Sequence, residues 1–141
     1  MERKEIETFL PHRPPMLLVD RVELDAEGIA RGEYTVRGDE HFLEGHFPGY
    51  PVVPGVVLCE IIAQSAGVLV REELQKSFTP LFAGMEGVRF RRMVRPGDVI
   101  RTVCKPIRIM GNLLKVAGEA RVDGQICAEG TFLLMLSRVD I

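Results

Sequence analysis

Residues 56–70 form a long segment that predicts a helix with apolar side chains on nearly all sides. A helix of that kind is normally buried in a protein core and does not lie on a surface. Pro54 suits the first turn of a helix, where its missing N–H group costs nothing. Charged residues return only at 71–73. We therefore expect a buried helix from about residue 54 to 75, around which the rest of the chain must fold.

The sequence on both sides of this helix is typical of strands, apart from a short amphipathic helix expected at residues 2–10. Two strands are expected before the long helix, at 16–24 and 28–36, and four after it, near 80–92, 97–109, 112–122 and 125–138. Asp123 and Gly124 are a strong signal for a two-residue hairpin. Strands joined by short turns favour an antiparallel sheet. The expected fold class is α+β, with an antiparallel sheet wrapped around one long buried helix.

The composition fits one domain that spans residues 1–141. Hydrophobic residues make up 46% of the chain, no linker divides it, and the net charge of −2 argues against a general nucleic-acid binder. No apolar stretch is long enough for a membrane span, and the charged N-terminus does not resemble a signal peptide. The three cysteines and three histidines lack zinc-site spacing, and scattered reduced thiols fit a cytoplasmic protein.

An irregular segment, residues 38–55, precedes the long helix and contains His46 among several glycines and prolines. A histidine can accept a proton near neutral pH and return it later. A loop histidine can equally lie at the surface or cap a turn. Prolines stiffen the backbone, and glycines allow conformations that other residues avoid. A rigid turn beside a histidine suggests that the turn positions the side chain. His46 is therefore a candidate general base.

Glu60 and Gln64 are the strongly polar residues inside the apolar helix, and a spacing of four places them on one helix face. An ionised carboxylate among apolar side chains is costly unless it is paired or protonated. A protonated Glu60 would be a usable general acid. Alternatively, Glu60 reaches solvent at a sheet edge or pairs with an arginine.

Gly55 opens the helix, where backbone N–H groups lack partners and the helix dipole is positive. Without a side chain in the way, the Gly55 N–H could polarise a carbonyl oxygen. Together, His46, Glu60 and Gly55 suit the removal of a proton beside a carbonyl and the loss of a β-hydroxyl as water. The same groups could also serve hydrolysis, or Gly55 could simply be part of a well-formed helix start.

Three blocks of the sequence resemble the (3R)-hydroxyacyl-acyl-carrier-protein dehydratases of type II fatty acid synthesis, which are hotdog-fold proteins. Residues 45–64, with the sequence GHFPGYPVVPGVVLCEIIAQ, are similar to the active-site signature of that family. Residues 10–22 resemble its N-terminal motif, and residues 82–98 resemble its mid-sheet motif. The resemblance extends over nearly the whole chain, in the order of the family.

The resemblance implies a role for each residue that matches the signature. His46 corresponds to the catalytic histidine, Glu60 to the catalytic glutamate, and Gly55 to the glycine whose N–H binds the thioester carbonyl. Val52 corresponds to the position whose carbonyl orients the histidine. Gln64, Phe47 and Tyr50 are further candidates for substrate binding, although Phe47 and Tyr50 could be plain core residues. A glutamate at position 60 argues against the branch of the family that also isomerises its product.

The resemblance also implies the partners and the cofactor requirement. The expected substrate is a 3-hydroxyacyl chain carried by acyl carrier protein, and no metal or organic cofactor is expected, because the thioester already acidifies the α-carbon. In the family, each active site takes its histidine and its glutamate from different subunits of a homodimer. Such dimers often assemble further as trimers of dimers, which we expect here.

Residues 86–108 contain seven basic and two acidic residues, in a chain that is acidic overall. Residues two apart on a strand share a face, so some of these arginines could form a stripe that attracts an acidic partner. The family's acidic carrier protein favours that interpretation for Arg89, Arg91, Arg92 and Arg95. The alternative is that these charges protect strand edges from aggregation.

Two other functions remain open from the residues alone. One is a hotdog thioesterase, in which a helix carboxylate activates water, and the release of free thiol would identify it. The other is a non-catalytic acyl-binding domain, although such a domain could dispense with His46 and Glu60. Binding of an acyl thioester without turnover would favour that third function.

Overall fold

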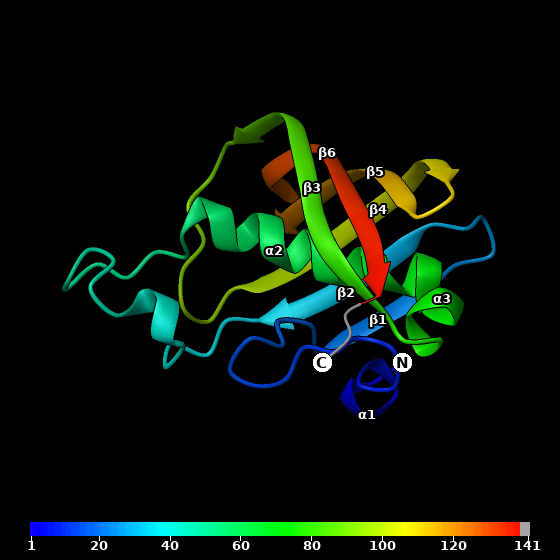
Figure 1. Cartoon of the computed structure of the whole chain (residues 1–141). Coiled ribbons are helices and arrows are strands. Elements are labelled where there is room, and N and C mark those ends of the chain that lie inside the picture. The colour runs from blue at the N-terminus through cyan, green and yellow to red at the C-terminus, as the bar shows by residue number, and fades with distance from the viewer. Residues whose placement is uncertain (139–141) are drawn as a thin grey trace.

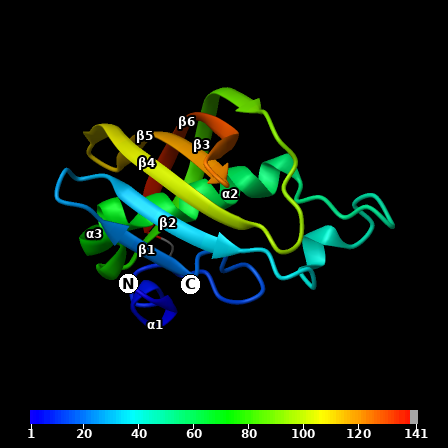
Figure 2. The ribbon, with the colours of Figure 1, turned by 180° about the vertical axis from the view of Figure 1, so that it is seen from behind.

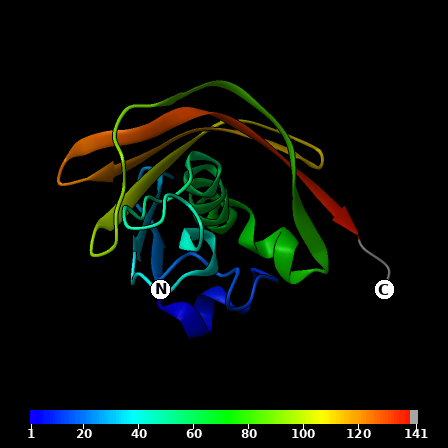
Figure 3. The same cartoon turned by 90° about the vertical axis from the view of Figure 1, so that its left-hand side faces the viewer.

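A six-stranded antiparallel sheet curves around helix α2 (Gly55–Ala66) in the computed structural model, which describes residues 1–138 (Figures 1 and 3). The strands are β1 (Arg21–Leu24), β2 (Ala30–Thr35), β3 (Phe78–Phe90), β4 (Val99–Met110), β5 (Leu113–Val122) and β6 (Gln125–Arg138). Their order in the sheet is β1-β2-β4-β5-β6-β3, and every neighbouring pair is antiparallel. The predicted α+β fold with a sheet wrapped around one helix is confirmed. Among the described residues, no helix is long and apolar enough to cross a membrane.

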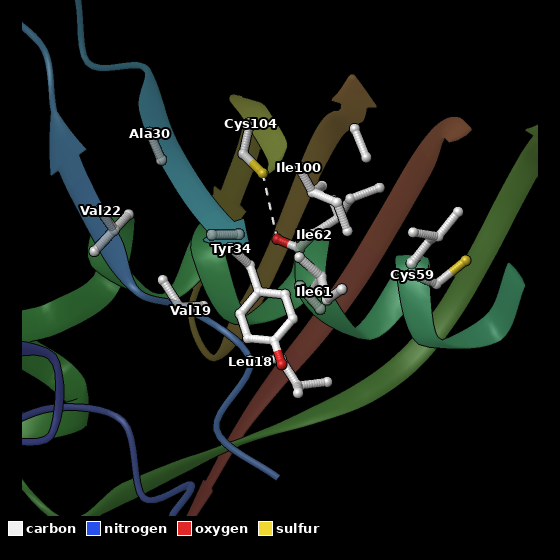
Figure 4. Close-up of a cluster of buried hydrophobic side chains, with 14 of the residues drawn as sticks. Leu18, Val19, Val22, Ala30, Tyr34, Cys59, Ile61, Ile62, Ile100 and Cys104 are labelled. Atoms are coloured by element: carbon white, nitrogen blue, oxygen red, sulfur yellow. Dashed lines mark hydrogen bonds between the residues drawn. The ribbon is translucent and has the colours of Figure 1, made fainter. Parts of the chain in front are cut away.

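Helix α2 lies very close to the sheet because two strand glycines face it. A Cβ atom on Gly32 of β2 would come within 2.5 Å of the Ser65 hydroxyl, and one on Gly118 of β5 within 2.5 Å of Ile62. The buried face of the helix, including Ile61 and Ile62, therefore fills the concave side of the sheet (Figure 4). Close packing of this kind makes the helix a rigid support for the polar groups that it carries.

The three cysteines, Cys59, Cys104 and Cys127, are free thiols buried in this core. Cys104 donates a hydrogen bond to the Ile62 carbonyl over 3.4 Å (Figure 4). Burial raises the pKa of the Cys104 thiol to about 12. Buried thiols with raised pKa values act as small apolar side chains and not as nucleophiles.

The long helix expected over 54–75 is interrupted. After Ala66 the chain tightens into a 3₁₀ turn (η2, Gly67–Val70) and then continues as α3 (Arg71–Gln75). The break falls at Gly67, where a Cβ atom would lie 2.7 Å from the Leu10 side chain. The N-terminal helix is also shorter than expected, since α1 covers Arg3–Ile6 only. Its apolar residues still pack into the core, because Ile6, Phe9 and Leu10 are all buried.

The strand expected over 16–24 begins only at Arg21, so its first half was predicted wrongly. Residues 17–19 are buried, but the side chain of Gln64 takes the backbone hydrogen bonds that a neighbouring strand would otherwise make. The Leu18 N–H donates to the Gln64 side-chain carbonyl over 2.8 Å, and the Gln64 amide donates to the Met16 carbonyl over 2.8 Å. This contact ties the segment directly to α2.

Strand β3 forms one edge of the sheet and carries apolar side chains that this chain leaves uncovered. Helix α2 packs mainly against β2, β4, β5 and β6. Phe82, Met85 and Phe90 pair with the buried residues Leu134, Phe132 and Ala128 of β6, so they belong to the concave face of the sheet. They are nevertheless 42%, 49% and 53% exposed. A long apolar edge strand is a surface that proteins normally cover.

The irregular segment between β2 and α2 projects beyond the N-terminal end of α2 (Figures 1 and 2). Its only regular element is a 3₁₀ turn, η1 (His41–Leu43). The segment ends at Pro54, whose carbonyl accepts the first backbone hydrogen bonds of α2, from Val57 and Leu58. The candidate base His46 therefore lies next to the positive end of this helix.

Candidate functional site

The imidazole of His46 is fixed by the backbone six residues further along the chain. Its Nδ1 atom lies 2.7 Å from the carbonyl oxygen of Val52. A carbonyl oxygen can only accept a hydrogen bond, so Nδ1 carries the proton of the neutral ring. The Nε2 atom is then left with a free lone pair and can take a proton from a substrate. This is the geometry that the expected roles of His46 and Val52 require.

A tight turn aims the His46 ring at Val52. Gly45 and Gly49 have φ values of 72° and 80°, and Phe47 between them has a φ of 63°. A bulky residue is rarely found in this left-handed region, and strain of this kind gathers at functional sites. The Phe47 ring lies beside the imidazole, with 4.3 Å between the ring centroids, and is 57% exposed.

His46 lines a pocket of about 890 Å³ at the start of α2, which we call the His46 pocket. Phe47, Val52 and Gly55 also line it. The ring of Phe90 lies against the helix start, where a Cβ atom on residue 55 would come within 2.8 Å of the ring. The N–H groups of the first turn of α2, including that of Gly55, have no carbonyl partner within the helix. The His46 pocket thus combines a proton acceptor with an electrophilic helix start.

Glu60 lines a second and smaller pocket of about 310 Å³, which we call the Glu60 pocket. Its other walls are mostly apolar and include Met16, Leu81 and Phe82. The Oε2 atom of Glu60 accepts a hydrogen bond of 2.7 Å from the amide of Gln64. No arginine or lysine forms an ion pair with Glu60 among residues 1–138, so the alternative of an arginine partner is not seen there.

Gln64 is buried, and its polar atoms are engaged by the protein itself. Its amide donates to Glu60 and to Met16, and its carbonyl accepts from Leu18. The side chain therefore cannot rotate without breaking three hydrogen bonds. Gln64 lies in the Glu60 pocket, as a substrate-binding residue would, but its contacts in this structure hold Glu60 in place.

The His46 and Glu60 pockets have no lining residue in common. Gly55 and Glu60 are five positions apart on α2, which corresponds to a rotation of about 140° around the helix axis. The helix start and the carboxyl group therefore face different sides of α2. Within one chain, the structure brings together His46, Val52, Phe47 and Gly55, but it does not bring Glu60 to them.

A second histidine lies beside Glu60 and was given no role by the sequence. The Nε2 atom of His12 is 3.5 Å from the Oε2 atom of Glu60, and His12 lines the Glu60 pocket. His12 precedes Glu60 by almost fifty residues in an irregular segment, so no spacing rule links the two. Its place in the N-terminal block was the only available signal.

Two of the four candidate arginines line the His46 pocket, and the other two do not. Arg91 and Arg92 line it, and Arg95 stacks over the ring of Tyr50 with 4.5 Å to the ring centroid. Arg91 also forms an ion pair with Glu129 over 2.7 Å. Because β3 ends at Phe90, the alternation expected of a strand does not extend to these arginines. They lie on the connection that follows β3, and Arg89 is the one that belongs to the strand.

Glu40 anchors the irregular segment that leads to His46. Its carboxylate, which is only 6% exposed, accepts hydrogen bonds from the Tyr34 hydroxyl at 2.6 Å and from the backbone N–H groups of Arg37 and Gly38 at 2.9 and 2.7 Å. Burial alone would raise the pKa of Glu40, but these hydrogen bonds to the charged form outweigh it and lower the pKa. The segment is thus held by an ionised, buried carboxylate.

Replacing Glu40 by glutamine is expected to lower the free energy of unfolding by about 1–3 kcal/mol at neutral pH, because an amide NH₂ would face N–H donors. The Glu40 pKa is lowered in the folded state, so its contribution is full above the ordinary carboxyl pKa of about 4.3 and is lost as pH falls through the folded value. The difference in free energy of unfolding between wild type and Glu40→Gln should therefore become smaller at acidic pH.

Urea unfolding of both proteins at about pH 7 and about pH 3 measures this difference. Glu44→Gln is a matched control, because Glu44 is exposed four residues further on. If the difference in free energy of unfolding is the same at both pH values, the role given to Glu40 is contradicted.

The sequence matches known proteins over most of its length. The family model of FabA-like domains matches residues 10–131. A protein from Bacillus pumilus named 3-hydroxyacyl-[acyl-carrier-protein] dehydratase FabZ is 43% identical over 131 residues, which cover 92% of this chain and 91% of that protein. A protein of the same name from Petrotoga mobilis is 39% identical and covers 98% of this chain and 99% of its own length.

Solved structures share the fold at low sequence identity. A chain of the dehydratase heterocomplex ApeI:P from Xenorhabdus doucetiae superposes with a TM-score of 0.81 at 20% identity and covers 94% of this chain and 91% of its own. A hypothetical thioesterase with coenzyme A from Streptococcus pneumoniae gives a TM-score of 0.62 at 12% identity, with 84% and 88% covered. Dehydratases and thioesterases thus share the architecture found here, and the structural likeness alone does not choose between them.

Proposed function

This chain belongs to the family of FabA-like domains, and we propose that it dehydrates 3-hydroxyacyl-acyl carrier protein with His46 as the base and Glu60 as the acid. Relatives about 40% identical to this chain over most of their length are named 3-hydroxyacyl-[acyl-carrier-protein] dehydratase, which supports this activity and a place in fatty acid biosynthesis. The single observation that carries the residue assignment is the hydrogen bond from His46 Nδ1 to Val52, which leaves Nε2 free as a base.

The proposed reaction removes one proton and one hydroxyl group from neighbouring carbons. Nε2 of His46 takes a proton from the α-carbon, and the Gly55 N–H stabilises the negative charge that develops on the thioester oxygen. Glu60, protonated at the start, gives its proton to the β-hydroxyl, the carbon–oxygen bond breaks, and water leaves. The product is a trans-2-enoyl thioester. The thioester itself acidifies the α-carbon, so these side chains suffice for the chemistry.

The base His46 and the acid Glu60 must act on the same substrate, but they lie in separate pockets of one chain. This separation supports an active site shared between two chains. One chain offers the base in the His46 pocket and the acid in the separate Glu60 pocket. In a homodimer, the His46 pocket of one subunit would meet the Glu60 pocket of the other, which gives two equal sites related by the twofold axis. Edge strand β3 is the proposed interface, because its uncovered apolar side chains include Phe82, Met85 and Phe90.

The carrier protein is proposed to dock over the mouth of the His46 pocket. Arg91 and Arg92 line this pocket, and Arg95, three residues further along the chain, stacks on the ring of Tyr50. Complementary charge steers an acidic partner toward such a group and orients it. Arg89 is exposed on β3 and extends the same basic surface. The expected trimer of dimers and the cytoplasmic location stay predictions.

The direct test is to incubate the protein with 3-hydroxyacyl-carrier protein and to measure the intact carrier by mass spectrometry. We expect the loss of one water molecule from the carrier-bound chain, and the reverse hydration when the trans-2-enoyl form is supplied. Release of the free acid with unloaded carrier would instead show a thioesterase. Binding without any change in mass would show an acyl-binding domain.

A further inference from the structure

His12 lies against the proposed acid, in a position that no part of the mechanism uses so far. It belongs to the irregular segment after α1 and lines the Glu60 pocket together with Glu60 and Gln64. Its Nε2 atom is 3.5 Å from Oε2 of Glu60. This distance is longer than a typical N–H···O hydrogen bond, and catalytic hydrogen bonds commonly tighten when substrate binds.

The surroundings of the ring determine which nitrogen of His12 carries the proton. The Nδ1 atom is buried and has no hydrogen-bond partner among residues 1–138. A buried N–H group without an acceptor is costly, so a proton on Nδ1 is disfavoured. With the proton on Nε2, the N–H group faces the oxygen of Glu60. The geometry therefore favours the Nε2–H form of a neutral imidazole.

The neighbours of His12 keep the ring neutral. Burial lowers the pKa of His12, the Glu60 carboxyl group opposes that shift, and Arg13 adds to it. The residues of β3 and β6 that line the Glu60 pocket with His12 are Pro80, Leu81, Phe82 and Leu134, and none of them carries a charge. A neutral imidazole beside Glu60 can donate a hydrogen bond without drawing the carboxyl group into a permanent ion pair.

The two oxygens of Glu60 are not equivalent in this arrangement. Oε2 accepts the Gln64 amide N–H at 2.7 Å and lies 3.5 Å from Nε2 of His12, so a proton on Nε2 would give this oxygen a second donor. An oxygen that accepts hydrogen bonds from two donors uses both of its lone pairs, so protonation of that oxygen is disfavoured. The acidic proton of Glu60 must then be on Oε1. Gln64 cannot turn away, because Met16 and Leu18 fix its other polar atoms.

We propose that His12 is a positioning residue that, together with Gln64, holds Oε2 of Glu60 and thereby leaves the transferable proton on Oε1, facing the substrate. The proposal rests on the proposed role of Glu60 as the general acid. It gives a function to an N-terminal histidine that lies outside the signature segment.

The kinetic test compares His12→Leu with His12→Gln, because the glutamine amide can still donate from about the position of Nε2. We expect His12→Leu to lower kcat about tenfold to a hundredfold, with KM for the carrier substrate unchanged within about twofold. His12→Gln should keep kcat within about threefold of wild type. His41→Leu is the matched control, because His41 is exposed on η1. Circular dichroism and the oligomer mass establish that each variant is folded.

Three results would overturn the proposal. A His12→Leu protein with wild-type kcat would show that Glu60 needs no help from this ring. A raised KM with unchanged kcat would point to direct substrate binding. Equal losses in both variants would show that hydrogen-bond donation is not the property that matters. If wild type dehydrates the substrate, Glu60→Gln does not, and His12→Leu matches wild type, then only this proposal fails. If wild type itself does not dehydrate, the proposed function fails.

A spectroscopic measurement tests the same geometry without any activity. ¹⁵N-labelled histidine distinguishes the two neutral forms of the ring by nuclear magnetic resonance, and the His12 signals are those missing from His12→Gln. We expect the Nε2–H form at neutral pH. An Nδ1–H form, or a charged ring, would contradict the proposed hydrogen bond to Glu60.

Discussion

Glu60→Gln is expected to lower kcat for dehydration by about 10²- to 10⁴-fold while leaving the fold intact. Glutamine has the shape of glutamate and can still accept the hydrogen bond from Gln64, so the packing of the Glu60 pocket is retained. It has no acidic proton to give to the β-hydroxyl group, so the carbon–oxygen bond would have to break without protonation. His46→Ala should cause a loss of kcat in the same range, because it removes the proposed base.

The effects of Glu60→Gln and His46→Ala on kcat should not be additive. Groups that act in one proton-transfer sequence fail together, so the double variant is expected to be about as inactive as either single variant. Steady-state kinetics with 3-hydroxyacyl-carrier protein measures all three. Glu72→Gln, on the exposed part of α3, is the matched control and should keep full activity. If Glu60→Gln kept more than about a tenth of wild-type kcat, the general acid would have to be another group.

Met85→Glu is expected to convert the proposed dimer into monomers and to lower activity by at least about a hundredfold. Met85 is 49% exposed on edge strand β3 in the single chain, and in the proposed dimer it would be covered. Burying an unpaired carboxylate in an apolar interface costs several kcal/mol, which is enough to separate many dimers. A monomer keeps His46 and Glu60 in separate pockets and therefore has no complete site.

Mass measurement in solution, together with the dehydration assay, tests this expectation. Met110→Glu is the matched control, because Met110 is 51% exposed near the end of β4, away from β3. It should leave both the dimer and the activity unchanged. A Met85→Glu protein that is still dimeric would place the interface elsewhere, and a fully active monomer would mean that one chain contains the whole site.

The sequence predicted the parts of the fold that local patterns determine. The apolar run after Pro54 is a buried helix, and the strands on either side of Asp123 and Gly124 form a hairpin in which both turn residues have the positive φ that such a turn requires. The separate strands were also found, because alternation and turn residues act over a few positions. The strand boundaries after the long helix differ from the expected ones by at most two residues, and those of β6 agree with the expectation.

Contacts between distant parts of the chain account for what was missed. The strand expected from residue 16 is shortened because Gln64, more than forty residues away, bonds to the backbone at Met16 and Leu18. The position of β3 at the sheet edge beside β6 likewise depends on the order of the whole sheet.

The candidate site shows the same division. His46 and its partner Val52 are six residues apart, and this pair could be proposed from the sequence. The contact between His12 and Glu60 joins an irregular segment to the long helix, and a single sequence contains no pattern that predicts it. The separation of the His46 and Glu60 pockets within one chain also became visible only in three dimensions.

Mixing His46→Ala chains with Glu60→Gln chains tests the central claim most directly. Each variant alone should be inactive, but after unfolding and refolding together, about a quarter of all sites should combine an intact His46 with an intact Glu60. We therefore expect about a quarter of wild-type activity from the mixture. A mixture of His46→Ala with the double variant contains no His46 and should stay inactive. If the first mixture also stays inactive although the chains have exchanged, the site is not shared between two subunits and the account is wrong.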